Sequence, residues 1–404
     1  MNKKTRVLIS AFACDPVTGS EPYVGWNWAN MLAEDVELHV LTRTYSRVLI
    51  GKHPLTNKVH FHYFDLPLAT NKNHYWRWIK FYYVIWQLLA LFYIWPIHRR
   101  TPFEIVHHVT YNNIDVSGFL WLLPGTRFVW GPVGGGQIPP ILLKEVFGTE
   151  WRKQSMRALM KKFARFNPLL RLSMRKSSLV LFANEETHDL VDDFCRRSEI
   201  MLETAIEPRP ILEDNQVKET VQFLWLGNAI PRKALGLAVD AFARASIVSG
   251  NAFKSKLIII GDGECLPAAK EMAENLGISS YVSFLGRISH SEVDAHMQNS
   301  DVFIFTSVQD TSGNVVLEAM ANGKPVIALR HQGVKSMVTM GGGILVDIAS
   351  YQETVESIAK AMITLATSQH ERIRMGMLAR LEVEKRHTWT AKKHRVLELY
   401  DEIM

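Results

Sequence analysis

The chain has 404 residues, of which 47% are hydrophobic and 21% charged, so it fits two globular domains and excludes an intrinsically disordered protein. Its three cysteines, Cys14, Cys195 and Cys265, form no CxxC pair, which argues against a disulfide framework or a zinc site and fits a reducing cytoplasm. The formal net charge of +6 favours an anionic partner, but it does not distinguish a nucleotide diphosphate from an anionic lipid or a nucleic acid.

Short apolar runs alternate with amphipathic stretches along the chain, which is the pattern of parallel sheets with helices on both faces. A strand begins directly after Thr5, so we expect no signal peptide. In the first half, strands are predicted at 6–12, 36–42, 58–64, 103–109, 126–130, 177–183 and 199–202. In the second half, strands are predicted at 221–227, 256–261, 281–285, 301–306 and 324–328, and helices at 233–247, 265–276, 290–299 and 315–322.

These elements predict an α/β protein with two Rossmann-like, doubly wound domains that face each other across a cleft. The predicted boundaries are an N-terminal domain at 1–206, a linker at 207–217, a C-terminal domain at 218–388, and a last helix at 389–404 that returns to the first domain. The linker is predicted because residues 207–217 are polar and contain Pro208 and Pro210. Open parallel sheets bind ligands beyond the carboxyl ends of their strands, so ligand-binding residues are expected in the loops that follow the strands.

The loop after the first strand contains Gly19 and Ser20 and leads into a helix that starts at Pro22. It is interpreted as a flexible loop whose amides reach a phosphate. The alternative is an ordinary connection between a strand and a helix.

Residues 81–95 form a nearly unbroken apolar run between Lys80 and Pro96. The run is shorter than the roughly 20 residues that span a bilayer, and its tryptophans and tyrosines suit a membrane interface. A helix buried against the first sheet is the alternative.

The fourth predicted strand ends in His107 and His108, and the fifth leads into the glycines Gly134, Gly135 and Gly136. A histidine at a strand end is more often structural than catalytic. Three residues without side chains leave room for an acceptor or for domain closure.

A basic segment follows, because no acidic residue occurs between Trp151 and Asn184 whereas nine lysines and arginines do. Within residues 156–176, Met156, Leu159, Met160 and others recur at helical spacing. This pattern indicates an amphipathic helix for a membrane surface, with a solvated basic face as the alternative. A nucleic-acid site is disfavoured because no stacking aromatics are interleaved on a sheet face.

In the second half, the strand that ends at Gly227 leads into Arg232 and Lys233 at the start of a helix, which predicts an anion site. Two further strands end in glycine turns, at Gly261 and at Gly286-Arg287.

The strongest signal is the strand at 301–306, followed by a polar loop with Asp310 and a helix that carries Glu318 eight residues later. The two carboxylates can therefore face one ligand. The backbone between them predicts a helix N-terminus that holds a pyrophosphate or sugar hydroxyls. The residues assigned to it are Thr311, Ser312, Gly313, Asn314 and Val315.

This pattern resembles the acidic-x7-acidic signature of the GT4 family of retaining glycosyltransferases, which have the GT-B fold. The resemblance covers the second half nearly end to end. It implies that Glu318 binds the donor ribose, Asp310 binds the donor sugar, and Arg232 and Lys233 neutralise the diphosphate. It also implies that Gly286-Arg287 contacts the base.

In the first half, the resemblance matches Gly19-Ser20 to the family's Gly-Gly loop and implies that a histidine near 107 contacts the donor sugar. We take His107 as that residue and place His108 and Gly134–Gly136 on the acceptor side. The motifs resemble a bacterial subgroup associated with surface polysaccharide assembly. The family usually has glutamate where this chain has Asp310, which affects the identity of the donor sugar more than the fold.

The sequence therefore predicts a retaining glycosyltransferase that needs no metal and no cofactor beyond its nucleotide diphosphate sugar, with UDP favoured over GDP. The acceptor is expected to be a glycan or a lipid-linked glycan, and the protein to lie at the inner face of the plasma membrane. Two alternatives remain open. One is an epimerase or hydrolase of nucleotide sugars with the same fold, and the other is a scaffold that binds nucleotide sugar without turnover.

Overall fold

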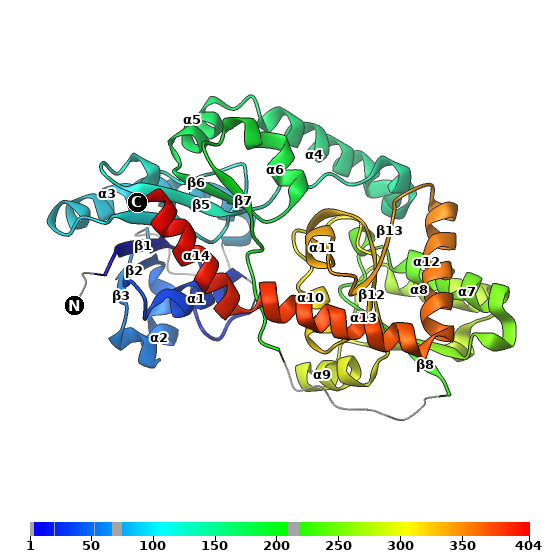
Figure 1. Cartoon of the computed structure of the whole chain (residues 1–404). Coiled ribbons are helices and arrows are strands. Elements are labelled where there is room, and N and C mark those ends of the chain that lie inside the picture. Colours follow the sequence, from blue (N-terminus) through cyan, green and yellow to red (C-terminus); the bar gives the residue numbers. More distant parts are fainter. Residues whose placement is uncertain (1–3, 20, 52, 67–74, 209–218) are drawn as a thin grey trace. The chain divides into compact units, whose positions relative to one another are not determined.

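The computed structural model describes residues 4–19, 21–51, 53–66, 75–208 and 219–404 (Figure 1). These residues form two compact units, each with its own parallel sheet, so the α/β prediction is confirmed. Unit 1 contains residues 1–136, 161–204 and 392–404, and unit 2 contains residues 137–160 and 205–391. Residues 209–217 of the predicted linker lie outside the described residues.

The sheet of unit 1 has seven strands in the order β3-β2-β1-β4-β5-β6-β7, and every pairing is parallel. Its strands are β1 (Arg6–Ser10), β2 (Glu37–Thr42), β3 (His60–Tyr63), β4 (Ile105–His108), β5 (Arg127–Val133), β6 (Leu179–Phe182) and β7 (Ser198–Ile200). Its helices are α1 (Glu21–Leu32), α2 (Arg47–Ile50), α3 (Tyr75–Arg100), α5 (Pro168–Lys176), α6 (Glu185–Val191) and most of α14 (Trp389–Ile403). The helix α4 (Trp151–Ala164) has residues in both units.

The sheet of unit 2 has six parallel strands in the order β10-β9-β8-β11-β12-β13. Its strands are β8 (Val221–Leu226), β9 (Ser255–Ile260), β10 (Val282–Gly286), β11 (Val302–Phe305), β12 (Val326–Leu329) and β13 (Gly343–Val346). Its helices are α7 (Leu235–Ser249), α8 (Leu266–Asn275), α9 (His290–Asn299), α10 (Asn314–Ala321), α11 (Gln332–Met337), α12 (Tyr351–Thr367) and α13 (Gln369–Glu382).

The central strands of both sheets form from apolar runs, because these strands are buried on both faces. Every residue of β4, β6, β11 and β12 is buried, as expected for parallel strands that are covered on both faces. Side-chain caps fix several helix starts. Ser289 and Glu292 form a capping box at α9, and Ser350 and Glu353 form another at α12.

Both sheets reverse their strand order at one point, which positions the ligand site. In unit 1 the reversal lies between β1 and β4, and in unit 2 it lies between β8 and β11. Ligands of open α/β sheets bind beyond the carboxyl ends of the strands at such a switch point. A ligand site is therefore expected in the loops after β1, β4, β8 and β11.

The segment 137–160 lies in unit 2, although the sequence analysis assigned it to the N-terminal domain. Leu143 and Phe147 are buried in the same core cluster as Phe223 and Phe242, which are residues of the second sheet and of α7. The short strand β13 was not predicted, because its sequence Gly-Ile-Leu-Val follows two further glycines and is only partly buried.

The apolar run at 81–95 is part of a longer helix than predicted, because Pro96 lies inside α3 instead of ending it. Among the described residues, the segment Phe81–Arg100 is long and apolar enough to span a bilayer by length and composition alone. However, Trp86, Ala90 and Ile94 have no exposed surface and pack in the core of unit 1. This burial supports the interpretation of α3 as a core helix.

The last helix packs within unit 1, where Figure 1 shows α14 (red) beside α1 (blue). The hydroxyl of Tyr400 lies 2.6 Å from Nδ1 of His107, and Nζ of Lys392 donates to the carbonyl of Leu202. The same ammonium group lies 5.4 Å from the ring centre of Trp28, a residue of α1. Residues close to the C-terminus therefore complete the core that the N-terminal residues begin.

Candidate functional site

Two charged loops of unit 2 meet at the switch point between β8 and β11. The loop after β8 carries Arg232 and Lys233, and the loop after β11 carries Asp310. Nζ of Lys233 forms an ion pair with the carboxylate of Asp310, and Nη1 of Arg232 lies 3.8 Å from Oδ1 of Asp310. The three residues that the sequence assigned to the donor diphosphate and sugar thus form one cluster.

This cluster remains partly open to solvent. The exposed fractions of the side chains are 38% for Arg232, 15% for Lys233 and 22% for Asp310. Two cations face one carboxylate, so the cluster keeps an excess of positive charge. A partly buried guanidinium and ammonium can bind phosphate oxygens strongly, because little water competes for them.

Hydrogen bonds hold the two loops together. The hydroxyls of Thr306 and Ser307 donate to the carbonyl oxygens of Lys233 and Arg232 over 3.0 Å and 3.2 Å. The amide of Val308 also donates to the Arg232 carbonyl, over 2.9 Å. The indole N–H of Trp225 in turn donates to the Thr306 hydroxyl over 3.1 Å. The backbone that carries the two cations is therefore fixed before any ligand binds.

The N-terminus of α10 lies directly after this cluster. Gly313 precedes the helix with φ 70°, and a Cβ atom there would lie 2.9 Å from the Phe305 ring, so glycine is required. No side chain caps the helix at Gly313. The helix dipole and the amides of the first turn favour an anion here, as the sequence predicted for the residues from Thr311 to Val315.

Glu318 follows in α10, about one turn after its first residue, Asn314. It is half-buried, and its carbonyl oxygen accepts a hydrogen bond of 2.8 Å from the Asn322 side chain. It therefore lies in the same unit and on the same helix as the predicted anion site. Its role at the ribose stays a prediction.

Gln332 supports the site but was not found in the sequence analysis. Its side-chain oxygen accepts the amide N–H of Asp310, and its Nε2 lies 3.5 Å from the carbonyl of Val308. The residue is buried and has φ 54°, which is uncommon for a residue other than glycine. A single glutamine after a strand has no sequence signature. The only available signal was its position after β12, at the same end of the sheet.

The glycine turns after β8, β9 and β10 are adjacent in the sheet. A Cβ atom on Gly261 would lie 1.8 Å from the carbonyl oxygen of Gly227, and Gly261 donates its amide to Gly286 over 2.8 Å. Gly286 has φ 66°, and the side chain of Arg287 that follows is exposed. Close packing between backbones thus explains Gly261, while Arg287 is accessible to a ligand.

The first loop of unit 1 contains Gly19, which is exposed and has open space around it, whereas Ser20 lies outside the described residues. The carboxylate of Asp15 accepts hydrogen bonds from the amides of Val17, over 3.0 Å, and Thr18. The amide of Asp15 donates to the carbonyl oxygen of Pro22 over 3.1 Å. The loop is therefore shaped by Asp15, and Gly19 lies at its exposed part.

Both histidines at the end of β4 are buried and hydrogen-bonded. Nε2 of His107 lies 2.9 Å from the carbonyl oxygen of Gly131, and its other nitrogen contacts Tyr400. Nε2 of His108 lies 2.8 Å from the Tyr83 hydroxyl. Burial lowers the pKa of both imidazoles, to about 4 for His107 and about 3 for His108. These contacts favour a structural role, and a contact of His107 with the donor sugar stays a prediction.

Packing explains two glycines of the run Gly134–Gly136, namely Gly135 and Gly136. A Cβ atom on Gly135 would lie 2.4 Å from the Asn113 side chain, and one on Gly136 would lie 2.7 Å from Cα of Thr187. Neighbouring residues of unit 1 fill the space that the sequence analysis left for an acceptor. The acceptor role of this run rests on the resemblance alone.

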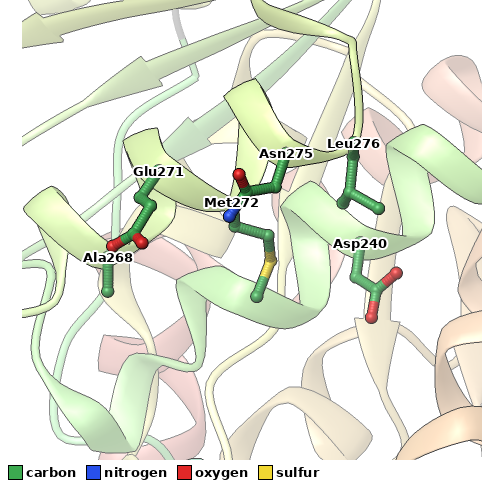
Figure 2. Close-up of a pocket in the computed structure, with 6 residues that line it drawn as sticks. All are labelled: Asp240, Ala268, Glu271, Met272, Asn275 and Leu276. Carbon is green, nitrogen blue, oxygen red and sulfur yellow. The ribbon is translucent and has the colours of Figure 1, made fainter.

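The described residues contain no group of three or more His, Cys, Asp or Glu side chains arranged to hold a metal ion. A groove of about 370 Å³ lies between α7 and α8, as Figure 2 shows. Its lining consists of Asp240, Ala268, Glu271, Met272, Asn275 and Leu276. None of these is a predicted site residue, so the groove is separate from the charged cluster.

Parts of the chain are similar to known glycosyltransferases. Residues 211–380 match the family model described as glycosyl transferases group 1. The alpha-monoglucosyldiacylglycerol synthase of Streptococcus pneumoniae is 38% identical over 86 residues, which is 21% of this chain and 20% of that protein. The lipopolysaccharide core biosynthesis glycosyltransferase LpsE of Rhizobium meliloti is 29% identical over 152 residues, covering 37% of this chain and 41% of that protein.

Solved structures resemble the chain over nearly its whole length. A sucrose-phosphate synthase from Thermosynechococcus elongatus has a TM-score of 0.68 at 15% identity and covers 99% of both chains. The Anabaena protein HepE, solved in complex with UDP, has a TM-score of 0.61 at 14% identity and covers 98% of this chain and 100% of that chain. These likenesses establish the GT-B fold, with two parallel α/β sheets.

Residues 211–380 are thus similar to the group 1 (GT4) glycosyltransferases, and the whole chain has the GT-B fold. The matched segments cover 20% and 41% of the lengths of these two curated relatives. The acceptors and sugars named for the relatives are therefore properties of those proteins.

Proposed function

We propose that the chain transfers a sugar from a nucleotide diphosphate sugar, with retention of configuration and without a metal, to a glycan or lipid-linked glycan. The observation that carries this proposal is the cluster of Arg232, Lys233 and Asp310 at the switch point of unit 2, directly before the N-terminus of α10.

The chemistry follows from these residues. The departing diphosphate develops negative charge, and Arg232, Lys233 and the N-terminus of α10 stabilise it in place of a metal ion. Glu318 accepts hydrogen bonds from the ribose hydroxyls, and Asp310 accepts hydrogen bonds from hydroxyls of the donor sugar. Retention places the acceptor hydroxyl on the face that the diphosphate leaves, where a phosphate oxygen takes up the proton.

UDP is the proposed nucleotide, in line with the UDP bound to the similarly folded HepE. The acceptor class has support from two relatives, whose names refer to a glucosyldiacylglycerol and to lipopolysaccharide core. We place the reaction in the synthesis of cell-surface polysaccharide, at the inner face of the plasma membrane.

Calorimetric titration with UDP and with GDP, in the presence of EDTA, tests the donor site. We expect UDP to bind, and we expect Arg232→Ala and Glu318→Ala each to weaken binding by roughly tenfold or more, because each removes a charged hydrogen-bonding partner. Arg244→Ala and Glu271→Ala are matched controls in the same unit, since Arg244 pairs with Glu356 and Glu271 lines the groove of Figure 2. Unchanged affinity in Glu318→Ala would contradict the ribose assignment.

Turnover separates the proposal from its alternatives. Incubation of the protein with UDP-sugars and a panel of glycan acceptors should yield a glycosylated product with the donor's anomeric configuration. Binding of UDP without a product on any acceptor would favour a scaffold. Release of free sugar or of an epimerised donor, equally fast without acceptor, would favour the hydrolase or epimerase.

A further inference from the structure

The helices α4 and α5 expose a row of large apolar side chains. On α4 the exposed fractions are 64% for Met156, 53% for Leu159, 68% for Met160 and 60% for Phe163. These residues are spaced three or four apart, so they share one face of the helix. In a soluble protein such a face is normally turned toward a core. On α4, however, the buried residue is the polar Gln154.

The row continues past the end of α4. Phe166 is 62% exposed, and Leu169 and Leu172 on α5 are 44% and 45% exposed. The amide of Phe166 donates to the Phe163 carbonyl over 2.9 Å, and Nε of Arg171 donates to the Arg165 carbonyl over 2.7 Å. These contacts fix the turn between the helices, with both phenylalanines on its exposed side. We call these seven residues, from Met156 to Leu172, the apolar row.

Cations flank the apolar row. The basic residues of α4 and α5 that are largely exposed are Arg152, Lys153, Arg157, Lys162, Arg175 and Lys176. No acidic residue occurs between Trp151 and Asn184, although Asp193 from a later segment lies 3.5 Å from Arg165. A helix with an apolar face and flanking lysines and arginines lies in the plane of a membrane interface, with its apolar side chains among the acyl chains.

Other helices also expose apolar side chains, and α13 and α3 serve for comparison. On α13, Ile373 and Met377 are 50% and 66% exposed, but Arg374 beside them pairs with Glu371 at 2.7 Å. On α3, Phe81 and Phe92 are both 64% exposed and the charged residues are also basic, but these cations lie near the two ends of the helix. An exposed apolar row with cations along its whole length therefore distinguishes α4 and α5 from α13 and α3.

We propose that α4 and α5 dock onto the surface of a bilayer that contains anionic lipid, with Phe163 and Phe166 inserted at the turn between the helices. The cations attract the anionic headgroups and orient the row, and the apolar side chains then supply the contact that salt does not screen. This surface deepens the membrane location given under the proposed function, but it does not depend on which sugar is transferred.

Vesicle cosedimentation of the full chain tests the proposal. We expect binding to phosphatidylcholine vesicles that contain phosphatidylglycerol, and little binding to phosphatidylcholine alone. The double variant Met160→Glu/Phe163→Glu should lose at least tenfold in affinity, because it places charge in the apolar row. The variant Lys153→Gln/Arg157→Gln/Lys162→Gln should lose about fivefold per cation, and raising the salt should weaken binding by the wild type.

The matched control is Ile373→Glu/Met377→Glu on α13, whose side chains are similarly exposed. It should bind vesicles like the wild type. Wild-type affinity in the Met160→Glu/Phe163→Glu variant, equal binding to uncharged vesicles, or no vesicle binding by the wild type would overturn the proposal. A dimer that this variant dissociates, in a wild type that ignores vesicles, would assign the row to a second copy of the chain instead.

Titration with UDP keeps the two proposals apart. All these variants should bind UDP like the wild type, because none lies in the charged cluster of unit 2. A wild type that binds vesicles but no UDP would leave the docking surface intact and contradict the donor site. A wild type that binds UDP but no vesicles would contradict only the docking surface.

Discussion

Glu21 is a residue whose environment the sequence did not reveal. It starts α1 directly after the exposed loop of unit 1, and its carboxylate accepts the amide of Tyr111 over 3.2 Å. Tyr111 follows β4 and has φ 57°, a conformation that costs free energy in a residue other than glycine. Glu21 thus links the loops after β1 and β4, which flank the switch point of unit 1.

Stability should depend on pH through Glu21. Burial raises the pKa of its carboxyl to about 7, the Tyr111 amide partly lowers it, and the neighbouring Glu203 raises it further. Between about pH 4.5 and 7 the folded state keeps a proton that the unfolded state has released, so the stability that Glu21 contributes falls as pH rises through this window. Glu21→Gln keeps an acceptor for the Tyr111 amide but cannot ionise.

We therefore expect Glu21→Gln to gain stability relative to the wild type between about pH 5 and pH 8, on the order of 1–3 kcal/mol. Urea unfolding of both proteins at the two pH values, followed by tryptophan fluorescence, measures the difference. A difference that is the same at both pH values would show that the buried carboxyl does not titrate in this window.

The charged members of the candidate site could be predicted from the sequence, and its supports could not. Arg232, Lys233 and Asp310 follow apolar runs whose strands are neighbours, so the topology of a parallel sheet brings them together. Gln332 acts through side-chain hydrogen bonds to Asp310 and Val308, and its backbone has an unusual conformation. His107 was chosen through the family resemblance, but Tyr400, distant in sequence, contacts it in the core.

At the scale of elements, α11 packs against the loop that precedes α10. A Cβ atom on Gly333 would lie 2.3 Å from the carbonyl oxygen of Thr311 and 2.6 Å from Cα of Ser312. Both neighbours are backbone atoms, which cannot rotate away as a side chain would. The glycine therefore sets how closely α11 approaches the predicted donor loop.

Gly333→Ala should displace that loop and weaken UDP binding by roughly tenfold or more, at a cost in stability of about 1–3 kcal/mol from overpacking. Gly236→Ala on α7 is the matched control, because a Cβ atom there meets only side-chain atoms at 3.7 Å and 3.8 Å. Calorimetry and thermal melting of both variants provide the measurements. Wild-type UDP affinity in a folded Gly333→Ala protein would exclude the loop from the donor site.

The predicted elements agree with the structure where burial gives a strong pattern. All twelve predicted strands are present, and the central ones are apolar runs in a sheet covered on both faces. The exceptions have local causes. The strand β13 is short and partly exposed, and α3 continues through Pro96, whose side chain is exposed.

At the scale of the whole molecule, unit 1 is built from separate segments of the chain, and its core requires the helix α14. Removal of residues 392–404 deletes the Tyr400 contact with His107 and the ion pair between Arg395 and Glu199. It also uncovers Trp28, whose indole now has no exposed surface. The unit would lose both apolar contact and the partners of buried polar groups.

We expect this truncation to lower the melting temperature of unit 1 by several degrees or more and to leave that of unit 2 unchanged. Calorimetry can assign the transitions, because UDP should raise only the one that belongs to the unit that binds it. Tyr400→Phe, which removes a single hydroxyl, should shift the same transition by less. An unchanged unit 1 transition in the truncated protein would contradict the requirement.

The division of unit 1 into three segments also affects how the protein is made. The chain passes from one unit to the other at residues 136–137, 160–161, 204–205 and 391–392. During synthesis, the strands of the first sheet leave the ribosome before unit 2, but the helix that covers Trp28 and His107 leaves after it. Unit 2 is complete in the meantime, so the nascent chain carries one finished unit and one with an uncovered core face. That face is an aggregation hazard and a binding site for chaperones until α14 has been made.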